Sequence, residues 1–403
     1  MTIRKQPSDF HVEELLTPET LGSIADRSSG NHVHALYQLD KISLTTPAAI
    51  NEFCRAVKAR PDHASYAGLK DKHAKTRQHV TVKLRTPADA PKSAEGKQWR
   101  ASFLGFLDHP IVAADIIGNR FAIVVRDLKR PESEEMDRRA SLLSFQPSSE
   151  IPHPTSLFIT NYFGAQRFGS ARHGAGWIAK SLITGDFETA LKLAIGTPAR
   201  KDTGKTRDFT RILASRWGDW KSMKDLPRLP EARAIEVLAR GGDFKEAFAA
   251  LPYFLQSLSV EAYQSHLWNR CACDLVRGMP GSFATQDEYG EMLFAPASLI
   301  QSPWHELELP LLARNSELLD PWKQTYERVL SSEGIAVADL RVKGLKRPFF
   351  GEAQRRLSIE AKNWSLTKPE PDELSKGGLR KRTACFDLPR GAYATVVLRA
   401  LGQ

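Results

Sequence analysis

Asp71 lies in a run of basic residues where a carboxylate could do chemistry. Residues 66–78 read YAGLKDKHAKTRQ, so that Lys70 and Lys72 flank the carboxylate and Arg77 follows it closely. Neighbouring cations favour the ionised form of a carboxyl group, and they also attract phosphate. A carboxylate nucleophile that works beside a nucleic-acid backbone needs both conditions. The alternative is a solvated surface turn, which is the commoner role of a short charged run.

Apolar patterns on both sides of this stretch predict the elements that position Asp71. Residues 9–15 and 31–39 alternate apolar and polar side chains, which indicates two strands. A proline at the first helical position, followed by apolar residues at helical spacing, predicts an amphipathic helix over 47–59. Residues 80–84 alternate again. We therefore expect Asp71 to lie in a loop between two buried strands.

Strand patterns continue after this loop. Residues 87–98 are rich in Pro, Ala, Lys and Ser and are expected to form a loop. Strands are expected over 99–107 and 111–117, and Gly118-Asn119 is expected to form a turn. Phe121 begins another alternating run. On the residues alone, this stretch is a hairpin that carries a core phenylalanine.

The stretch over residues 161–169 reads NYFGAQRFG and combines two glycines, three aromatic residues and Arg167. This composition is too irregular for a regular strand or helix. Such residues occur in structural loops, and they also form the platforms on which unpaired bases stack. Prolines at 147, 152 and 154 precede the stretch and mark a change in composition, which we interpret as a domain boundary.

Two strongly basic segments are candidates for contact with a polyanion. Residues 197–228 lie in a region with helical patterns and contain nine Lys or Arg against four Asp. This segment either contacts RNA or forms a solvated face. Residues 376–382, KGGLRKR, form a compact basic patch beside an expected strand over 384–388.

Composition and charge limit the class of protein. The chain has 403 residues, of which 41% are hydrophobic, and this length is typical of two or three domains. The net charge of +10 favours a polyanionic partner. No apolar run approaches the ~20 residues of a membrane helix, and the N-terminus, MTIRKQPSDF, has no apolar signal segment. We expect a cytoplasmic protein.

No metal or nucleotide motif stands out. The four cysteines form no CxxC pair, and His32 and His34 have no cluster of cysteines or carboxylates near them in the sequence. Gly204-Lys205-Thr206 is similar to the end of a phosphate-binding P-loop, but Ala199 stands where the first glycine is required. We expect no metal site and no cofactor.

Three stretches together resemble the TruD family of pseudouridine synthases. GLKDKHAKTRQ at 68–78 is similar to the family's signature around its catalytic aspartate. GNRFAIVVR at 118–126 resembles a second family motif, and NYFGAQRFG resembles a third. YQSHLWN, GLKRP and FDLPRGAYATVVLRALG resemble further family segments, so the resemblance runs from residue 9 to residue 399 in the family's order.

The resemblance implies an α/β (α+β) fold. A mixed-sheet catalytic domain would be built from both chain ends, and an α/β domain peculiar to the family would be inserted between them. On this basis residues 1–154 form the N-terminal part of the catalytic domain, 155–340 the inserted TRUD domain, and 341–403 the C-terminal part. The region 171–256 is longer than in compact bacterial members and is similar to that of archaeal and eukaryotic ones, which leaves the RNA target open.

The resemblance also implies roles for individual residues. Asp71 takes the place of the catalytic aspartate, Asn119 lies near it, and Phe121 stacks on the target base. Arg4 takes the place of a basic side chain beside the aspartate, with Lys5 as the alternative. Arginine for lysine preserves charge but not hydrogen-bond shape. We expect contacts to RNA from Lys70, Lys72, Arg77, Arg167, Arg207, Arg211, Arg380, Lys381 and Arg382.

These motifs predict a tRNA pseudouridine synthase that acts at the family's usual site, uridine 13, with an aspartate nucleophile. The isomerisation changes no oxidation state and loses no group, so no cofactor is expected. We expect a monomer that binds tRNA, with no metal and no membrane. The alternatives are a synthase with a different RNA target and an RNA-binding or RNA-folding protein with dispensable catalysis. The joint presence of Asp71, Asn119 and Phe121 favours a synthase.

Overall fold

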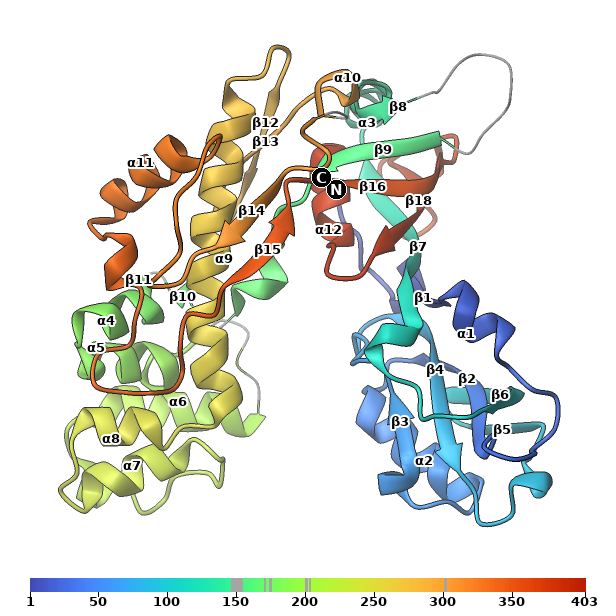
Figure 1. Ribbon diagram of the computed structural model, residues 1–403, viewed down its shortest axis with the longest axis horizontal. Helices are drawn as coiled ribbons and strands as arrows, with labels where there is room; N and C mark the ends of the chain where they lie inside the picture. Colours follow the sequence, from blue (N-terminus) through green and yellow to red (C-terminus); the bar gives the residue numbers. More distant parts are fainter. Residues whose placement is uncertain (146–154, 170–171, 174–175, 200–201, 203, 301–302) are drawn as a thin grey trace. The chain divides into compact units, whose positions relative to one another are not determined.

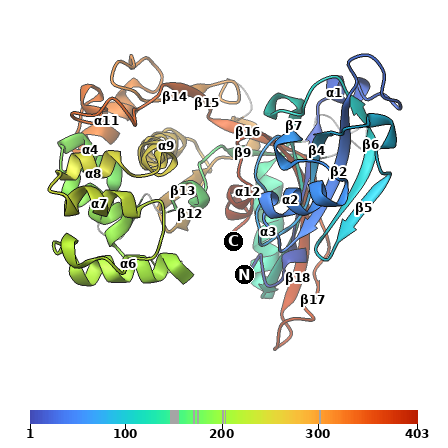
Figure 2. The same ribbon diagram turned by 90° about the horizontal axis from the view of Figure 1, so that it is seen from below.

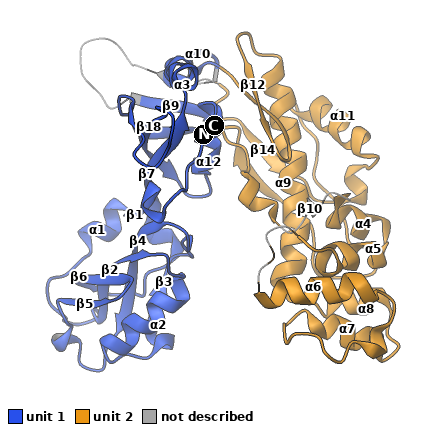
Figure 3. Cartoon of the chain, turned by 180° about the vertical axis from the view of Figure 1, so that it is seen from behind, with its two compact units in different colours: residues 1–159, 296–301, 359–403 blue, residues 160–295, 302–358 orange. Residues whose placement is uncertain are grey.

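The computed structural model describes residues 1–145, 155–169, 172–173, 176–199, 202, 204–300 and 303–403. The chain divides into two compact units, which Figure 3 distinguishes by colour. Unit 1 comprises residues 1–159, 296–301 and 359–403, and unit 2 comprises residues 160–295 and 302–358. Unit 1 therefore contains both chain ends. The boundaries predicted after residues 154 and 340 remain predictions, because a compact unit need not coincide with an insertion in the sequence.

A large mixed sheet is the framework of unit 1 (Figure 1). Its strands follow the order β5-β6-β2-β4-β1-β7-β18-β16-β9-β8, with β3 beside β4 and β17 beside β18. Strands β1 and β4 are parallel, whereas β4 is antiparallel to β2, and β7 is antiparallel to both β1 and β18. The strands are β1 Phe10–Leu16, β2 His34–Ile42, β3 Ala64–Tyr66, β4 Lys75–Lys83, β5 Ser93–Gly96, β6 Trp99–Leu107, β7 Ile116–Leu128, β8 Ser144–Phe145, β9 Thr155–Thr160, β16 Ser358–Leu366, β17 Glu370–Pro371 and β18 Arg380–Pro389.

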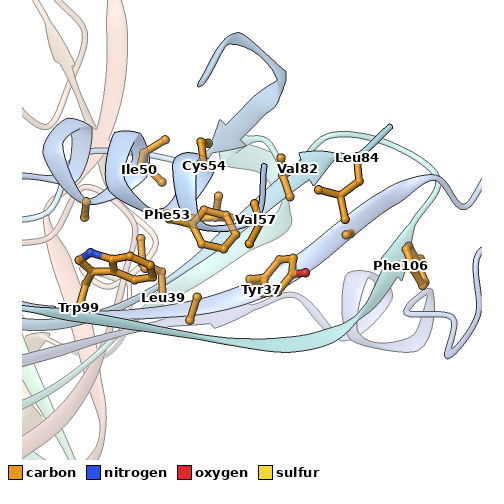
Figure 4. Close-up of a cluster of buried hydrophobic side chains, with 14 residues drawn as sticks. Tyr37, Leu39, Ile50, Phe53, Cys54, Val57, Val82, Leu84, Trp99 and Phe106 are labelled. Atoms are coloured by element: carbon orange, nitrogen blue, oxygen red, sulfur yellow. The ribbon is translucent and has the colours of Figure 1, made fainter. Parts of the chain in front are cut away.

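Helix α2 covers part of this sheet and fixes the base of the Asp71 loop. Its apolar stripe packs on side chains from β2, β4 and β6 (Figure 4). Phe53 is fully buried, with its ring 5.0 Å from that of Tyr37 and 6.1 Å from that of Trp99. Replacing such a phenylalanine by alanine costs about 3–5 kcal/mol. The helices of unit 1 are α1 Pro18–Gly22, α2 Thr46–Ala56, α3 Arg130–Leu143, α10 Ala297–Ile300 and α12 Ala394–Ala400.

Strand β7 runs unbroken through Gly118 and Asn119, so the predicted turn at these residues is wrong. Asn119 is paired with Glu14 of β1 on one side and with Leu388 of β18 on the other. Position 118 requires a glycine because the backbone of β18 lies very close to it. A Cβ at Gly118 would lie 2.1 Å from the carbonyl oxygen of Leu388. The strand predicted over 111–117 is also wrong for most of its length, since a short 3-10 helix precedes β7.

Most other predicted elements of unit 1 are confirmed. The strands expected over 9–15 and 31–39 correspond to β1 and β2, and the helix expected over 47–59 corresponds to α2. Within the loop expected over 87–98, however, Ser93–Gly96 forms the strand β5 against β6. This short segment has no apolar alternation that would predict a strand. The mixed α/β fold class is confirmed.

The long helix α9, Tyr253–Arg277, is the central element of unit 2, and Figure 2 looks almost along its axis. The apolar stripe of this helix is buried, with Tyr263, Leu267 and Trp268 almost inaccessible to water. The other helices are α4 Ile178–Thr184, α5 Phe187–Leu191, α6 Gly204–Arg216, α7 Ala232–Ala239, α8 Phe244–Ala249 and α11 Lys323–Glu333. The strand pairs are β10 Arg172–His173 with β11 Gly176–Trp177, β12 Phe283–Asp287 with β13 Gly290–Phe294, and β14 Glu308–Leu311 with β15 Ala353–Arg356.

Candidate active site

The carboxylate of Asp71 is held from two sides in the loop between β3 and β4. Its Oδ2 lies 2.9 Å from Nη1 of Arg4, and its Oδ1 accepts a hydrogen bond of 2.8 Å from the backbone N–H of His73. The side chain of Asp71 remains 26% exposed and that of Arg4 37% exposed. The pair is therefore oriented, and it is still accessible from outside.

Lys41 also supports the Asp71 loop, although it was not among the predicted site residues. The residue is 2% exposed, and Nζ donates a hydrogen bond of 3.0 Å to the backbone carbonyl of Asp71. Burial lowers the pKa of Lys41 to about 8, against the opposing effect of the Asp71 charge, and the charge of Lys70 adds to the lowering. The missed signal was a lysine at an inward position of the alternating strand β2, in line with Leu39.

Two buried polar side chains fix the backbone of the loop before Asp71. The backbone N–H of Lys70 donates to Oγ1 of Thr46 at 3.0 Å, and Oγ1 of Thr46 donates to Oε1 of Gln78 at 2.9 Å. Nε2 of Gln78 in turn donates to the carbonyl of Gly68 at 3.4 Å. Thr46 lies in the first turn of α2 and Gln78 lies in β4, so the helix and the sheet together set the course of the loop.

Lys70, expected to contact RNA, lies instead inside the site and connects two strands. Its Nζ lies 2.7 Å from Oε1 of Glu14 in β1 and donates to Oδ1 of Asn119 in β7 at 2.8 Å. Glu14 is 2% exposed, and its other oxygen accepts from the backbone N–H of His79 at 2.8 Å. Burial alone would raise the pKa of Glu14, but hydrogen bonds from His79 and the charge of Lys70 outweigh it, so that the pKa is lowered. The missed signal was a carboxylate at an inward position of β1, in line with Phe10 and Val12.

Phe121 is part of an aromatic row that crosses three adjacent strands. It lies opposite Val12 of β1 and opposite Phe386 of β18. Its ring is stacked on that of Phe386 at 5.6 Å, and the ring of Phe10 meets it edge-on at 6.2 Å. Phe121 is 8% exposed. The register of the sheet therefore sets the position of this ring.

Arg4 connects the aromatic row to the carboxylate. Its Cζ lies 4.3 Å from the centroid of the Phe10 ring while Nη1 contacts Asp71. The structure thus links all four predicted residues of the site: Arg4 contacts Asp71, Lys70 next to Asp71 contacts Asn119, and Phe10 beneath Arg4 contacts Phe121. Lys5, the alternative to Arg4, lies 2.5 Å from Asp127 and 2.7 Å from Ser375 and is engaged there.

Comparison with known proteins decides the family. The model of the family tRNA pseudouridine synthase D (TruD) matches residues 1–401. The chain belongs to the TruD family. The resemblance noted in the sequence is thereby confirmed, and the enzyme class is that of a pseudouridine synthase, which is an isomerase.

Relatives with this family name match the TruD chain over nearly its whole length. The tRNA pseudouridine synthase D of Aquifex aeolicus is 26% identical and aligns over 99% of this chain and 97% of its own. The candidate tRNA pseudouridine synthase D 2 of Methanocaldococcus jannaschii is 27% identical over 99% of this chain and 91% of its own. A crystal structure of a candidate TruD from Methanosarcina mazei has a TM-score of 0.71 at 22% identity, covering 99% of this chain and 92% of that one, and supports the fold.

The basic residues of unit 1 that were expected to contact RNA occupy different environments. Lys72 and Arg380 are exposed. Arg77 lies 3.0 Å from Asp40 and 3.4 Å from Glu13, and Lys381 lies 2.6 Å from Glu373. These four side chains remain candidates for RNA contact.

Arg382, by contrast, is buried and bonded to other groups inside unit 1. It is 5% exposed, and its guanidinium donates to the carbonyl of Thr367 at 2.7 Å and to the carbonyl of Ser133 at 3.0 Å. It also lies 2.7 Å from Asp137. Because these groups already satisfy its donors inside the unit, we leave Arg382 out of the RNA contacts proposed below.

The three arginines expected to contact RNA in unit 2 also differ. Arg167 lies 2.8 Å from Glu261 and donates to Ser265, so it is held against α9. Arg207 and Arg211 are both exposed on α6, one turn apart, and Nε of Arg207 donates to the carbonyl of Asp202 at 2.9 Å. Of these three, only the α6 pair therefore presents positive charge directly to water.

Proposed function

We propose that this TruD-family protein converts a uridine of tRNA to pseudouridine, at position 13, with Asp71 as the nucleophile. The observation that carries the proposal is the Arg4–Asp71 ion pair of 2.9 Å beside an aromatic row, in a site that is partly open to water. A buried carboxylate would be unreachable, and an isolated exposed one would have no fixed geometry. The Asp71 carboxylate avoids both faults.

The reaction needs a carboxylate, a charge that holds it and a wall that retains the detached base. Asp71 attacks the substrate, and the bond between the ribose and the ring nitrogen breaks. The uracil then rejoins the ribose through a ring carbon, and the bond that Asp71 formed breaks, which frees the carboxylate. The ring carbon loses its proton, while the freed ring nitrogen gains one. The product is an isomer of the substrate, so no cofactor enters the balance. Attack on the sugar and attack on the base are both compatible with this placement of Asp71.

Arg4 and Asn119 have separate roles in this proposal. The guanidinium of Arg4 holds one oxygen of the Asp71 carboxylate in place at 2.9 Å. The Oδ1 of Asn119 is engaged by Lys70 at 2.8 Å, which leaves the amide N–H groups to donate to a uracil carbonyl. Phe121 has no hydroxyl and supplies an apolar surface for the base. It cannot accept the proton that the ring carbon loses.

The target base must leave its stack before Asp71 can reach it, at a cost of a few kcal/mol. Phosphate contacts offset this cost, with counterion release as the driving force. We propose Lys72, Arg380 and the exposed arginines of α6 as such contacts.

We further propose a monomer that acts in the cytoplasm. Within the described ranges no helix is both long and apolar enough to cross a membrane.

Mapping pseudouridines in the RNA of cells that have or lack the protein tests the proposal. Cells that carry Asp71→Asn serve as the matched control, because asparagine has the shape of aspartate but cannot act as a carboxylate nucleophile. We expect pseudouridine at position 13 of tRNA only with the unchanged protein. Pseudouridine at another site would favour a different RNA target. Full complementation of a growth defect by Asp71→Asn would favour an RNA-folding function.

Activity in the presence of a chelator tests the expected independence of metal. Among the described residues, no group of three His, Cys, Asp or Glu is placed to hold a metal ion. We expect turnover of a tRNA transcript in EDTA without any added cofactor, once the fold of the RNA has been controlled for. Loss of turnover that zinc restores would contradict this expectation.

A further inference from the structure

Three large aromatic side chains of unit 2 are exposed to water. Phe254 is 77% exposed, Phe349 60% and Tyr253 51%. Tyr253 and Phe254 begin α9, and Phe349 lies in the loop that leads into β15 (Figure 1). Solitary exposed apolar residues are ordinary, but several in adjacent segments indicate a surface that binds something.

The two segments lie side by side. The Cζ of Arg347 lies 5.9 Å from the centroid of the Tyr253 ring. Further along α9, Nε2 of Gln264 donates a hydrogen bond of 2.8 Å to the carbonyl of Gly351. The loop that carries Phe349 is therefore held along α9 on both sides of this residue, so the three rings belong to adjacent segments.

The loop that carries Phe349 is rich in positive charge. Residues 341–356 contain six Lys or Arg and one acidic residue. Lys346 and Arg347 are exposed, and neither forms an ion pair with another described residue. The side chain of Lys245 passes over Gly344, where an added Cβ would lie 3.3 Å from its Cδ. The 253/349 surface, as we name it, consists of Lys245, Tyr253, Phe254, Lys346, Arg347 and Phe349.

We propose that the 253/349 surface binds an unpaired segment of the tRNA, a site distinct from the Asp71 loop. This inference rests on the proposed function, which supplies the RNA. Exposed rings stack on bases of any sequence, and neighbouring cations contact the phosphates between them. A duplex would reach only the cations and leave the rings in water. The combination of the two residue types therefore fits single-stranded RNA better than a helix.

Binding measurements on the full-length protein test this inference. All variants carry Asp71→Asn, so that the RNA is not converted during the titration. Phe254→Ala with Phe349→Ala removes two rings, and Lys346→Ala with Arg347→Ala removes two charges. Leu319→Ala, an apolar residue that is 50% exposed between Glu317 and Asp320, is the control for the rings. Arg314→Ala with Lys323→Ala removes two other exposed charges of unit 2.

The probes are an unmodified tRNA transcript, a single-stranded RNA of roughly 12 nucleotides and a duplex of the same length. We expect the loss of two rings to weaken binding of the tRNA and the single strand about tenfold or more. Duplex binding and the salt dependence should not change. Loss of the two charges should lower the log–log salt slope for tRNA by about 1.4–1.8. The controls should stay within about twofold of the parent.

Unchanged tRNA binding by the ring variant would overturn the inference, and so would an equal loss for duplex and single strand. Disappearance of a dimer in light scattering on loss of the rings, with RNA binding intact, would make the surface a protein interface instead. Pseudouridine formation by the protein with Asp71 intact is measured in parallel. If the protein forms pseudouridine but loss of the rings leaves tRNA binding unchanged, only this inference is wrong. If loss of the rings weakens tRNA binding but the protein forms no pseudouridine, only the proposed function is wrong.

Discussion

Arg4 and Asp71 lie 2.9 Å apart because the strands that follow them are parallel neighbours. Arg4 precedes β1 and Asp71 precedes β4, and the pairing of β1 with β4 starts at His11 and Lys75. The segments that lead into two adjacent parallel strands enter the sheet at the same end. The chain topology thus brings a cation from the N-terminus to the carboxylate of a distant loop.

Arg4 should matter for catalysis much more than for stability. We expect Arg4→Ala to lower kcat about 10- to 100-fold, since a hydrogen bond to a charged group is worth roughly 1.5–3 kcal/mol. Both side chains of the pair are partly exposed, so the thermal midpoint should shift little. Arg4→Lys should restore part of the rate, because it keeps the charge but lacks the planar guanidinium. Equal kcat values for wild type and Arg4→Ala would refute the role.

The Glu14–Lys70 pair is expected to stabilise the fold and to position Asn119. Glu14→Gln leaves the ammonium of Lys70 without a counter-charge at a side-chain exposure of 13%, and breaking such a pair costs about 3–5 kcal/mol. We expect a large drop in the denaturation midpoint together with a loss of activity.

The double variant Glu14→Gln with Lys70→Met separates the two effects. It removes both charges, so the stability should largely recover, as buried pairs replaced by neutral groups often do. Activity should stay low, because Oδ1 of Asn119 no longer accepts from Lys70. Recovery of stability and activity together would show that Lys70 does not position Asn119.

Lys41 should make the stability of the protein depend on pH. Its pKa falls from the ordinary 10.5 to about 8 on folding, chiefly through burial. Between these values the unfolded chain binds more protons than the folded protein, so stability rises with pH there. At about 1.4 kcal/mol for each pKa unit, the gain is at most roughly 3 kcal/mol.

Comparison of wild type with Lys41→Met isolates this effect, because all other titrating groups are common to both proteins. The urea midpoint of wild type, measured relative to that of the variant, should be higher at pH 9.5 than at pH 7. An equal difference between the wild-type and variant midpoints at both pH values would mean that Lys41 is not buried as an ammonium in solution.

Residues with a strong local pattern were predictable from the sequence, and residues that act through distant partners were not. The Asp71 loop stands out by its charge run, and the alternation around it predicts β1, β2 and β4. The turn predicted at Gly118 is wrong because this glycine is required by its close approach to the carbonyl of Leu388, a residue far away in the sequence. Glu14 shares the inward face of β1 with Phe10 and Val12, but only its contact with Lys70 reveals its role.

Arg382 shows that a local pattern can be present and overlooked. Residues 380–388 alternate, and Arg382 shares its face with the buried Ala384, Phe386 and Leu388. The composition of the patch suggested an exposed surface, whereas the alternation places this arginine inward. Where composition and alternation disagree in a strand, the alternation is the better guide, because a strand presents successive side chains to opposite faces.

The exposed arginines of α6 should contribute RNA affinity and not chemistry. Replacing Arg207, Arg211 and Arg216 with alanine removes three charges, of which Arg216 is already paired with Asp225 at 3.0 Å. Removing one cation that neutralises a phosphate lowers the log–log salt slope by roughly 0.7–0.9. We therefore expect weaker tRNA binding with a slope lowered by about 1.4–1.8, if Arg207 and Arg211 are the two that bind phosphates. Single-turnover rates at saturating enzyme should stay close to wild type, since Asp71 is untouched.

A salt titration of tRNA binding compares this triple variant with wild type and with a control. The control, Lys129→Ala with Arg130→Ala and Arg138→Ala, removes the same charge from exposed residues at α3. If net charge alone governed binding, the two variants would change affinity and slope equally. If α6 is only a solvated face, its variant would give a line that coincides with wild type. The RNA would then have to bind elsewhere, with Arg380 and Lys381 as the next residues to replace.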